Sequence, residues 1–225
     1  MIKGIVFDLD GTLVDSVNIH LISWIEACKL LGISAKLDST TINMIKDLVG
    51  LAAEDIALTI TGDESKAKNL AELKRRIYLE KIDSITPFPG VVDGIRKLRE
   101  LGLRIAIASS TSRATIEAVT KNTGIINLID DYVGSDEVIR RKPDPEMFLK
   151  AMKKIGIEPN EAIVVGDTKY DIAPANQLGA ISILICWRGC NEVDVRPTFY
   201  AYTIDDVIEI AKILLKTGER LQKMP

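Results

Sequence analysis

The feature that most constrains the fold of this chain is a regular alternation of strand-like and helical patterns after residue 90. Short apolar runs rich in Ile, Val and Ala alternate with longer segments whose apolar residues recur at helical spacing. Strands separated by helices imply right-handed crossovers, so the pattern predicts a parallel sheet with helices on both faces. The expected strands are 103–108, 132–133, 162–165 and 181–185, and the expected helices are 91–101, 113–121, 144–155, 169–178 and 204–215.

The chain opens on one further strand that leads directly into two carboxylates. Residues 2–7 form a short, largely apolar run that is typical of a central, buried strand. Asp8 and Asp10 follow at a spacing that sends both side chains the same way in extended backbone, and Gly11 then permits a turn. Taken alone, this stretch fits an ordinary loop equally well. Two carboxylates aimed at one spot repel each other unless a cation lies between them, which favours a site for Mg²⁺.

Only helical patterns occur between this strand and the regular alternation. They cover residues 15–31, 40–49, 54–61 and 64–82, before a proline-rich stretch marks the return of the strands. An all-helical block that follows a single strand indicates an insertion. We therefore predict an α/β fold with a discontinuous Rossmann-like core and an inserted all-helical domain. The core comprises residues 1–14 and 85–225, the insertion comprises residues 15–84, and the hinges are expected at residues 13–16 and 84–89.

Composition excludes several classes of protein. A net charge of −3 and a pI near 5.4 give no basic footprint for nucleic acid. No apolar run is long enough to span a membrane. Cys28, Cys186 and Cys190 match neither a disulfide framework nor a metal-binding CxxC pair, so we expect small buried thiols. These features predict a cytoplasmic protein without a nucleic-acid or membrane partner. A monomer or weak homodimer is the default expectation, which no residue pattern supports.

Polar residues follow the ends of several expected strands. Ser109 and Asp167 each come directly after a strand, and Asp171 lies four residues beyond the second of them. Ligands bind beyond the carboxyl ends of parallel strands, so we expect these side chains to meet the two N-terminal carboxylates. Lys142, in a loop bordered by two prolines, adds a positive charge. A metal, a lysine and hydroxyls among carboxylates indicate a phosphoryl site in which a carboxylate is the nucleophile.

Four motifs together resemble those of the haloacid dehalogenase superfamily, in its order and across essentially the whole chain. They are DLDGTLVDS from Asp8 to Ser16, a serine after the second strand, Lys142 followed by proline, and Gly-Asp at 166–167 with Asp171. The resemblance implies a Rossmann-like core of the HAD-like fold. It also implies that the inserted helices are a cap domain of the superfamily's first type.

The resemblance assigns a role to each motif residue. Asp8 would be the nucleophile that forms an aspartyl-phosphate, while Asp10 would protonate the leaving oxygen and then activate water. Ser109 and Lys142 would bind the phosphoryl group. The implied Mg²⁺ ligands are Asp8, the backbone carbonyl of Asp10, Asp167 and Asp171. Further substrate contacts are implied for Gly11, Thr12, Ser110 and His20.

Within the superfamily, the residues favour a phosphatase. Asp10 argues for phosphate esters, because the dehalogenases lack an acid at this position. Asp167 with Asp171 resembles phosphoglycolate phosphatase. We therefore expect a Mg²⁺-dependent phosphatase acting on a small phosphorylated metabolite, with phosphoglycolate first and sugar phosphates next.

Two alternatives stay open. His20 and Trp24 resemble a pattern of β-phosphoglucomutase, although the arginine that binds the distal phosphate in that enzyme is missing from residues 50–55. The second alternative is a catalytically silent phosphate-binding protein of the same fold. The presence of all the motif residues argues against it.

Two further groups of residues carry weaker expectations. Lys74, Arg75 and Arg76 could meet an anionic substrate, but a run of charges on a helix is more typical of a solvated face. Trp187 and Arg188 follow the last expected strand and could border the cleft, without a spacing argument for either.

Overall fold

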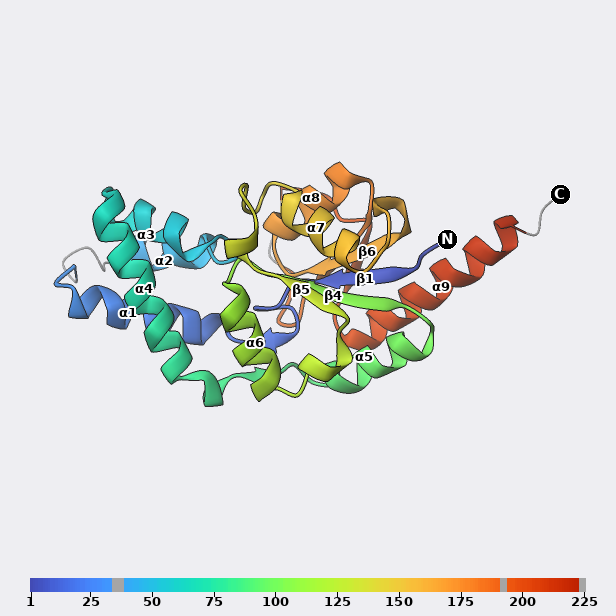
Figure 1. Cartoon of the computed structure of the whole chain (residues 1–225), viewed down its shortest axis with the longest axis horizontal. Coiled ribbons are helices and arrows are strands. Elements are labelled where there is room, and N and C mark those ends of the chain that lie inside the picture. Colours follow the sequence, from blue (N-terminus) through green and yellow to red (C-terminus); the bar gives the residue numbers. More distant parts are fainter. Residues whose placement is uncertain (34–38, 191–193, 223–225) are drawn as a thin grey trace.

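The computed structural model describes residues 1–33, 39–190 and 194–222 of the chain, and its core is a six-stranded sheet (Figure 1). All pairings in this sheet are parallel, which confirms the predicted α/β fold class. In spatial order the strands are β5 (Asp131–Val133), β4 (Arg104–Ala108), β1 (Gly4–Phe7), β6 (Ala162–Gly166), β7 (Ile181–Ile185) and β8 (Phe199–Ala201).

Strand β1 lies in the middle of the sheet and is buried on both faces. Because side-chain direction alternates along a strand, Phe7 packs in the apolar cluster on one face and Val6 in the cluster on the other. Three helices cover the Phe7 face: α5 (Val91–Glu100), α6 (Arg113–Asn122) and α9 (Ile204–Gln222). Two helices cover the Val6 face: α7 (Glu146–Lys154) and α8 (Lys169–Leu178) (Figure 1).

A group of four helices lies at one end of the molecule, around an apolar cluster of its own (Figure 1). The cluster contains Trp24, Ile56 and Leu70. The helices are α1 (Val17–Leu30), α2 (Ser39–Asp47), α3 (Ala53–Thr61) and α4 (Glu64–Glu80). We call this group the cap. The boundaries that we predict for it, at residues 15 and 84, stay a prediction.

Short segments were beyond the reach of the sequence patterns. Two two-residue strands, β2 (Val14–Asp15) and β3 (Thr86–Pro87), form an antiparallel pair where the chain enters and leaves the cap. Strand β8 was also missed, because it has three residues and the first two are exposed aromatic side chains. None of the described helices is both long and apolar enough to cross a membrane.

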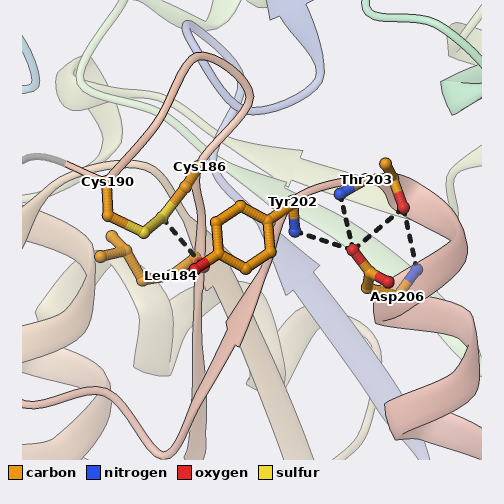
Figure 2. Close-up of a disulfide and its surroundings, with 6 residues drawn as sticks. All are labelled: Leu184, Cys186, Cys190, Tyr202, Thr203 and Asp206. Carbon is orange, nitrogen blue, oxygen red and sulfur yellow. Dashed lines mark hydrogen bonds between the residues drawn. A yellow bond between two sulfur atoms is a disulfide. The ribbon is translucent and has the colours of Figure 1, made fainter.

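The expectation of three buried thiols is wrong for two of the cysteines. Cys186 and Cys190 form a disulfide just after β7 (Figure 2). Gly189, at a φ of 99°, turns the chain back so that the two Cα atoms lie 4.8 Å apart. Spacing alone did not reveal this turn. Cys28 is a buried free thiol, as expected.

Candidate active site

The turn after β1 fixes both N-terminal carboxylates at the edge of the sheet. The Asp8 N–H donates to the carbonyl of Val165 (2.9 Å), which continues the β1–β6 pairing by one residue. The buried Leu9 then accepts three backbone N–H groups with its carbonyl, from residues 12, 13 and 14, and closes the turn. Asp8 and Asp10 consequently line the same cavity.

Gly11 is required by this turn for two reasons. Its φ of 87° lies in the left-handed region that disfavours side chains, and a Cβ there would lie 2.3 Å from Oδ2 of Asp167. The structure thus places Gly11 against a carboxylate. Thr12, the next residue, donates its hydroxyl to Oδ1 of Asp167 (3.1 Å). Both residues support Asp167 in this structure.

Three carboxylates converge beside the end of β6. Asp8, Asp167 and Asp171 each place one oxygen within 4.8 Å of the other two. Gly166 permits this approach, because a Cβ at that position would lie 2.2 Å from the Cβ of Asp171. Asp171 is held in the first turn of α8 by the N–H and hydroxyl of Thr168, which donate to its Oδ2 (3.1 and 2.8 Å).

The ammonium group of Lys142 bridges two of these carboxylates. Its side chain is 0% exposed, and its Nζ donates to Oδ1 of Asp8 (2.6 Å) and to Oδ1 of Asp171 (2.7 Å). Burial alone would lower the pKa of Lys142, but the carboxylates of Asp171 and Asp8 raise it above its ordinary value. Lys142 is therefore an ammonium at any physiological pH.

One ammonium does not balance three carboxylates. Burial raises the pKa of Asp8 to about 7, against the attraction of Lys142 and with the repulsion of Asp171. Burial and the neighbouring Asp8 and Asp171 also raise the pKa of Asp167 well above its ordinary value. A divalent cation with a preference for oxygen ligands would relieve this repulsion, so the residues present fit a Mg²⁺-type site.

We expect the stabilisation by added Mg²⁺ to increase with pH. Because folding raises the pKa values of Asp8 and Asp167, these two carboxyls stabilise the metal-free fold most below about pH 4, their ordinary pKa. The contribution of Asp8 is lost as the pH rises through about 7, and that of Asp167 is also lost above its ordinary range. Mg²⁺ displaces those protons, so its effect is largest at about pH 8, where a hundredfold excess over Kd adds about 2.7 kcal/mol.

Thermal unfolding with and without Mg²⁺, at about pH 5 and about pH 8, measures this difference. The lowered pKa of His20 changes stability in the opposite direction with pH, because the stabilisation that neutral His20 provides is lost as the pH falls. That contribution is present with and without the metal, and it cancels in the comparison. An equal rise in Tm at both pH values would contradict the assignment of the metal ligands.

Asp10 is held by a separate group of side chains. Its Oδ1 accepts hydrogen bonds from the hydroxyls of Ser16 (2.6 Å) and Tyr78 (2.9 Å), and its Oδ2 lies 3.5 Å from the Ser109 hydroxyl. Nε2 of His20 is 2.9 Å from Oδ1, within ion-pair distance but outside hydrogen-bond alignment. Burial would raise the pKa of Asp10, yet His20, Ser16 and Tyr78 together lower it. Asp10 is thus an ionised base in this structure.

His20 links Asp10 to a buried lysine of the cap. Nζ of Lys74 lies 2.5 Å from Nδ1 of His20, and because an ammonium can only donate, Nδ1 is the acceptor. The ring proton is then on Nε2, the nitrogen that faces Asp10. Burial lowers the pKa of Lys74 to about 8, and burial with the Lys74 charge lowers that of His20. The His20 ring stacks on Tyr78 at 4.2 Å.

The expectation of a solvated charged face is wrong for Lys74. This residue is 6% exposed, whereas Arg76 is 71% exposed and Arg75 is bound by Glu54 (2.8 Å). The signal in the sequence was helical spacing, because Lys74 lies four residues from the buried Leu70 on α4. Tyr78, which the sequence analysis did not single out, lies four residues further along the same face.

The two serines after β4 have different partners. The hydroxyl of Ser109 accepts the N–H of Thr111 (3.2 Å) and faces Asp10, inside the cavity. The hydroxyl of Ser110 donates instead to the carbonyl of Gly50 in the cap (2.6 Å). Ser110 therefore contacts the cap in this structure.

The cap lies closed over the site. Besides the Ser110 contact, Tyr170 donates to the carbonyl of Asp47 (3.3 Å), and Arg141 forms an ion pair with Asp55 (3.5 Å). The cavity between cap and core measures about 50 Å³. This is room for a few water molecules, so the cap has to open before a small organic molecule can enter.

Comparison with known proteins places the chain in a family. The sequence model of the haloacid dehalogenase-like hydrolases matches residues 5–185, most of the chain. This chain is a haloacid dehalogenase-like hydrolase. The match confirms the superfamily that the four motifs predicted.

The chain is also similar to individual phosphatases and to the structure of a hydrolase. Pyrophosphatase PpaX of Bacillus velezensis is 28% identical over 95% of each chain, and a phosphoglycolate phosphatase of Aquifex aeolicus is 27% identical over 82% of this chain and 85% of its own. The crystal structure of a hydrolase from Pseudomonas syringae has a TM-score of 0.82 and 27% identity, covering 93% of this chain and 98% of its own. The class of enzyme, a phosphatase-type hydrolase, is as the sequence predicted.

Proposed function

We propose that this haloacid dehalogenase-like hydrolase is a Mg²⁺-dependent phosphatase that acts on a small phosphorylated metabolite through an aspartyl-phosphate. One observation carries the proposal: Asp8 lies 2.6 Å from the buried Lys142, within reach of two further carboxylates, and lines the same cavity as Asp10. A nucleophile and an acid–base group then line one small space, while a fixed positive charge and two further metal ligands lie next to the nucleophile.

The residues would divide the reaction into two steps. Asp8 attacks phosphorus and the bond from phosphorus to the leaving oxygen breaks. That oxygen takes its proton from Asp10, which is ionised in this structure and therefore has to take up a proton from solvent before this step. Asp10 then takes a proton from water, which attacks the aspartyl-phosphate and releases inorganic phosphate. Lys142 and the Ser109 hydroxyl stabilise the phosphoryl oxygens. Mg²⁺, held by Asp8, Asp167, Asp171 and the carbonyl of Asp10, would screen charge as the phosphoryl group approaches the carboxylates.

The preferred substrate is one with a second anionic group. Among the described residues that line the cavity, Lys74 alone is a lysine or arginine, and it comes from helix α4 of the cap. A carboxylate or second phosphate would replace water near this ammonium. Phosphoglycolate has such a group and leads the candidates, and the relative from Aquifex aeolicus is named a phosphoglycolate phosphatase. Sugar phosphates come next, and the PpaX relatives add pyrophosphate to the substrates to be compared.

We expect Lys74→Met to lower kcat/KM for phosphoglycolate by about tenfold to a hundredfold more than for phenyl phosphate. The reason is that only the first substrate offers an anion to Lys74. The ratio of the two values is decisive, because loss of the contact with His20 affects both substrates alike. Arg76→Met, on the exposed side of the same helix, is the matched control. An unchanged ratio would remove Lys74 from substrate recognition.

A phosphomutase is the second candidate, favoured by one observation. His20 faces Asp10, and both His20 and Trp24 line the cavity, as in the mutase pattern that they resemble. The test supplies β-glucose 1-phosphate with the corresponding bisphosphate. Glucose 6-phosphate formed faster than inorganic phosphate would establish the mutase.

A catalytically silent protein is the third candidate. Turnover of p-nitrophenyl phosphate with and without Mg²⁺ separates it from an enzyme, since no hydrolysis with any divalent ion would favour the silent protein. A cytoplasmic location and a monomer or weak homodimer complete the proposal. The disulfide removes one of the reasons for that location, because disulfides are rare in most cytosolic proteins.

A further inference from the structure

The loop from Cys186 to Cys190 is closed on itself by the disulfide (Figure 2). It lines a cavity together with Gly11 and Asp167. One end is anchored, because Cys186 is buried and its N–H donates to the carbonyl of Ala201 in β8 (2.8 Å). The other end, Cys190, is exposed. The loop is therefore a small ring, fixed to the sheet at one side and open to solvent at the other.

Two residues of this ring contact the chain where it enters the cap. The indole N–H of Trp187 donates to the carbonyl of Thr12 (2.9 Å). The guanidinium of Arg188 pairs with Asp15 in β2 at 2.5 Å. Both contacts fall on the segment 12–15, which follows the catalytic carboxylates directly.

The same two residues also contact the chain where it leaves the cap. Phe88 directly follows β3, and the Trp187 ring stacks on it with centroids 4.6 Å apart and planes within 6°. The guanidinium carbon of Arg188 lies 6.0 Å from the centre of the Phe88 ring. Phe88 is tied in turn to the entering segment, since its N–H donates to the carbonyl of Leu13 (3.0 Å). The disulfide-closed loop thus contacts both crossings between core and cap, the segment that enters the cap and the segment that leaves it.

The ring also reaches the proposed metal ligands. A cavity of about 190 Å³ is lined by the ring on one side and by Gly11 and Asp167 on the other. Thr12, whose carbonyl is bound by Trp187, donates its hydroxyl to Asp167. A displacement of Trp187 would therefore be transmitted through one residue to a carboxylate of the site.

We propose that the Cys186–Cys190 disulfide is a redox-sensitive positioning device, which keeps Trp187 and Arg188 on both crossings and thereby supports catalysis. The Arg188–Asp15 pair cannot do this alone, because Arg188 is 60% exposed and exposed ion pairs contribute little. The cross-link removes the freedom that the loop would otherwise have. Reduction restores that freedom and weakens the contacts of Trp187 with Thr12 and Phe88.

The switch needs a dithiol reductant, such as dithiothreitol or a dithiol protein. Its thiolate attacks the sulfur of the exposed Cys190, the S–S bond breaks, and Cys186 leaves as a thiolate that takes up a proton. The second thiol of the reductant then displaces Cys190. Two electrons and two protons pass to the protein, which gains two thiols, and the reductant becomes a cyclic disulfide.

The first test compares the oxidised and the dithiothreitol-reduced enzyme, with p-nitrophenyl phosphate as substrate. Thiol titration of the denatured chain should find one thiol, that of Cys28, before reduction and three afterwards. We expect reduction to lower kcat/KM by roughly threefold to tenfold and to raise the Mg²⁺ concentration for half-maximal activity. A Cys186→Ser/Cys190→Ser variant should match the reduced enzyme and ignore the reductant, whereas Cys28→Ser should keep the response.

A second test follows Trp187 itself. The chain has two tryptophans, so Trp24→Phe leaves Trp187 as the only tryptophan, and its fluorescence, excited beyond the absorption of tyrosine, should shift on reduction. Trp187→Phe keeps a ring to stack on Phe88 but lacks the N–H that binds Thr12. If Trp187 acts as a positioning residue, this variant needs more Mg²⁺ and loses most of the redox response.

Three results would overturn the proposal. They are three free thiols in the protein before reduction, equal kcat/KM in both redox states, or tryptophan emission that ignores the reductant. If neither form hydrolyses any substrate, the proposed function fails instead, and the emission measurement still decides the redox device.

Discussion

Asp8→Asn is expected to abolish hydrolysis, with a fall in kcat of at least roughly 10⁴-fold. The amide has the size of the carboxylate but cannot form an acyl-phosphate under these conditions. The fold should survive, since Lys142 keeps its bond to Asp171 (2.7 Å). Loss of one of three mutually repelling carboxylates should also leave the metal-free protein at least as stable at about pH 8.

The measurement is kcat with p-nitrophenyl phosphate at saturating Mg²⁺, together with mass spectrometry of acid-quenched enzyme. The native enzyme should carry one phosphoryl group on the peptide that contains Asp8, and the variant none. Asp83→Asn, an exposed carboxylate outside the cavity, is the matched control. More than about a tenth of native activity in Asp8→Asn would show that another group is the nucleophile.

Asp10→Asn should separate the two chemical steps. A metabolite ester has a poor leaving group that needs a proton, so its turnover should fall by roughly 10²–10⁴-fold. An aryl phosphate leaves without that proton, so the first step should survive while the attack of water, which needs Asp10 as base, is slow. We therefore expect a burst of one p-nitrophenolate per enzyme, followed by a slow steady rate.

Rapid mixing with p-nitrophenyl phosphate measures this burst. Tyr78→Phe is the comparison, because it removes one hydrogen bond to Asp10 and leaves the carboxylate in place. It should lower kcat less than Asp10→Asn and show no burst. A linear time course for Asp10→Asn, at the native rate, would exclude Asp10 from both steps.

The residues that the sequence predicted best are those whose position follows from strand order alone. Asp8, Ser109 and Asp167 each follow a strand of one parallel sheet, so the shared edge brings them together without knowledge of any side-chain contact. The period of the apolar residues was enough to predict those strands.

The residues that were missed depend on long-range contacts between cap and core. Tyr78 is an ordinary amphipathic-helix residue by its spacing, and its bond to Asp10 exists only because α4 lies over the core. Lys74 was predicted to be solvated, because charge runs usually are, and only the position of α4 buries it. The disulfide depends on a turn at Gly189, which two cysteines four residues apart do not reveal.

The contacts that several side chains make with Oδ1 of Asp10 have a consequence for the pKa of this carboxyl during each catalytic cycle. Two of its partners, His20 and Tyr78, belong to the cap, whereas Asp10 belongs to the core. When the cap swings away to release product, Asp10 parts from both and becomes a weaker acid, with a pKa nearer its ordinary value. Proton affinity at this one oxygen therefore rises and falls with every turnover, and an infrared probe of the carboxyl would record the cap's movement directly.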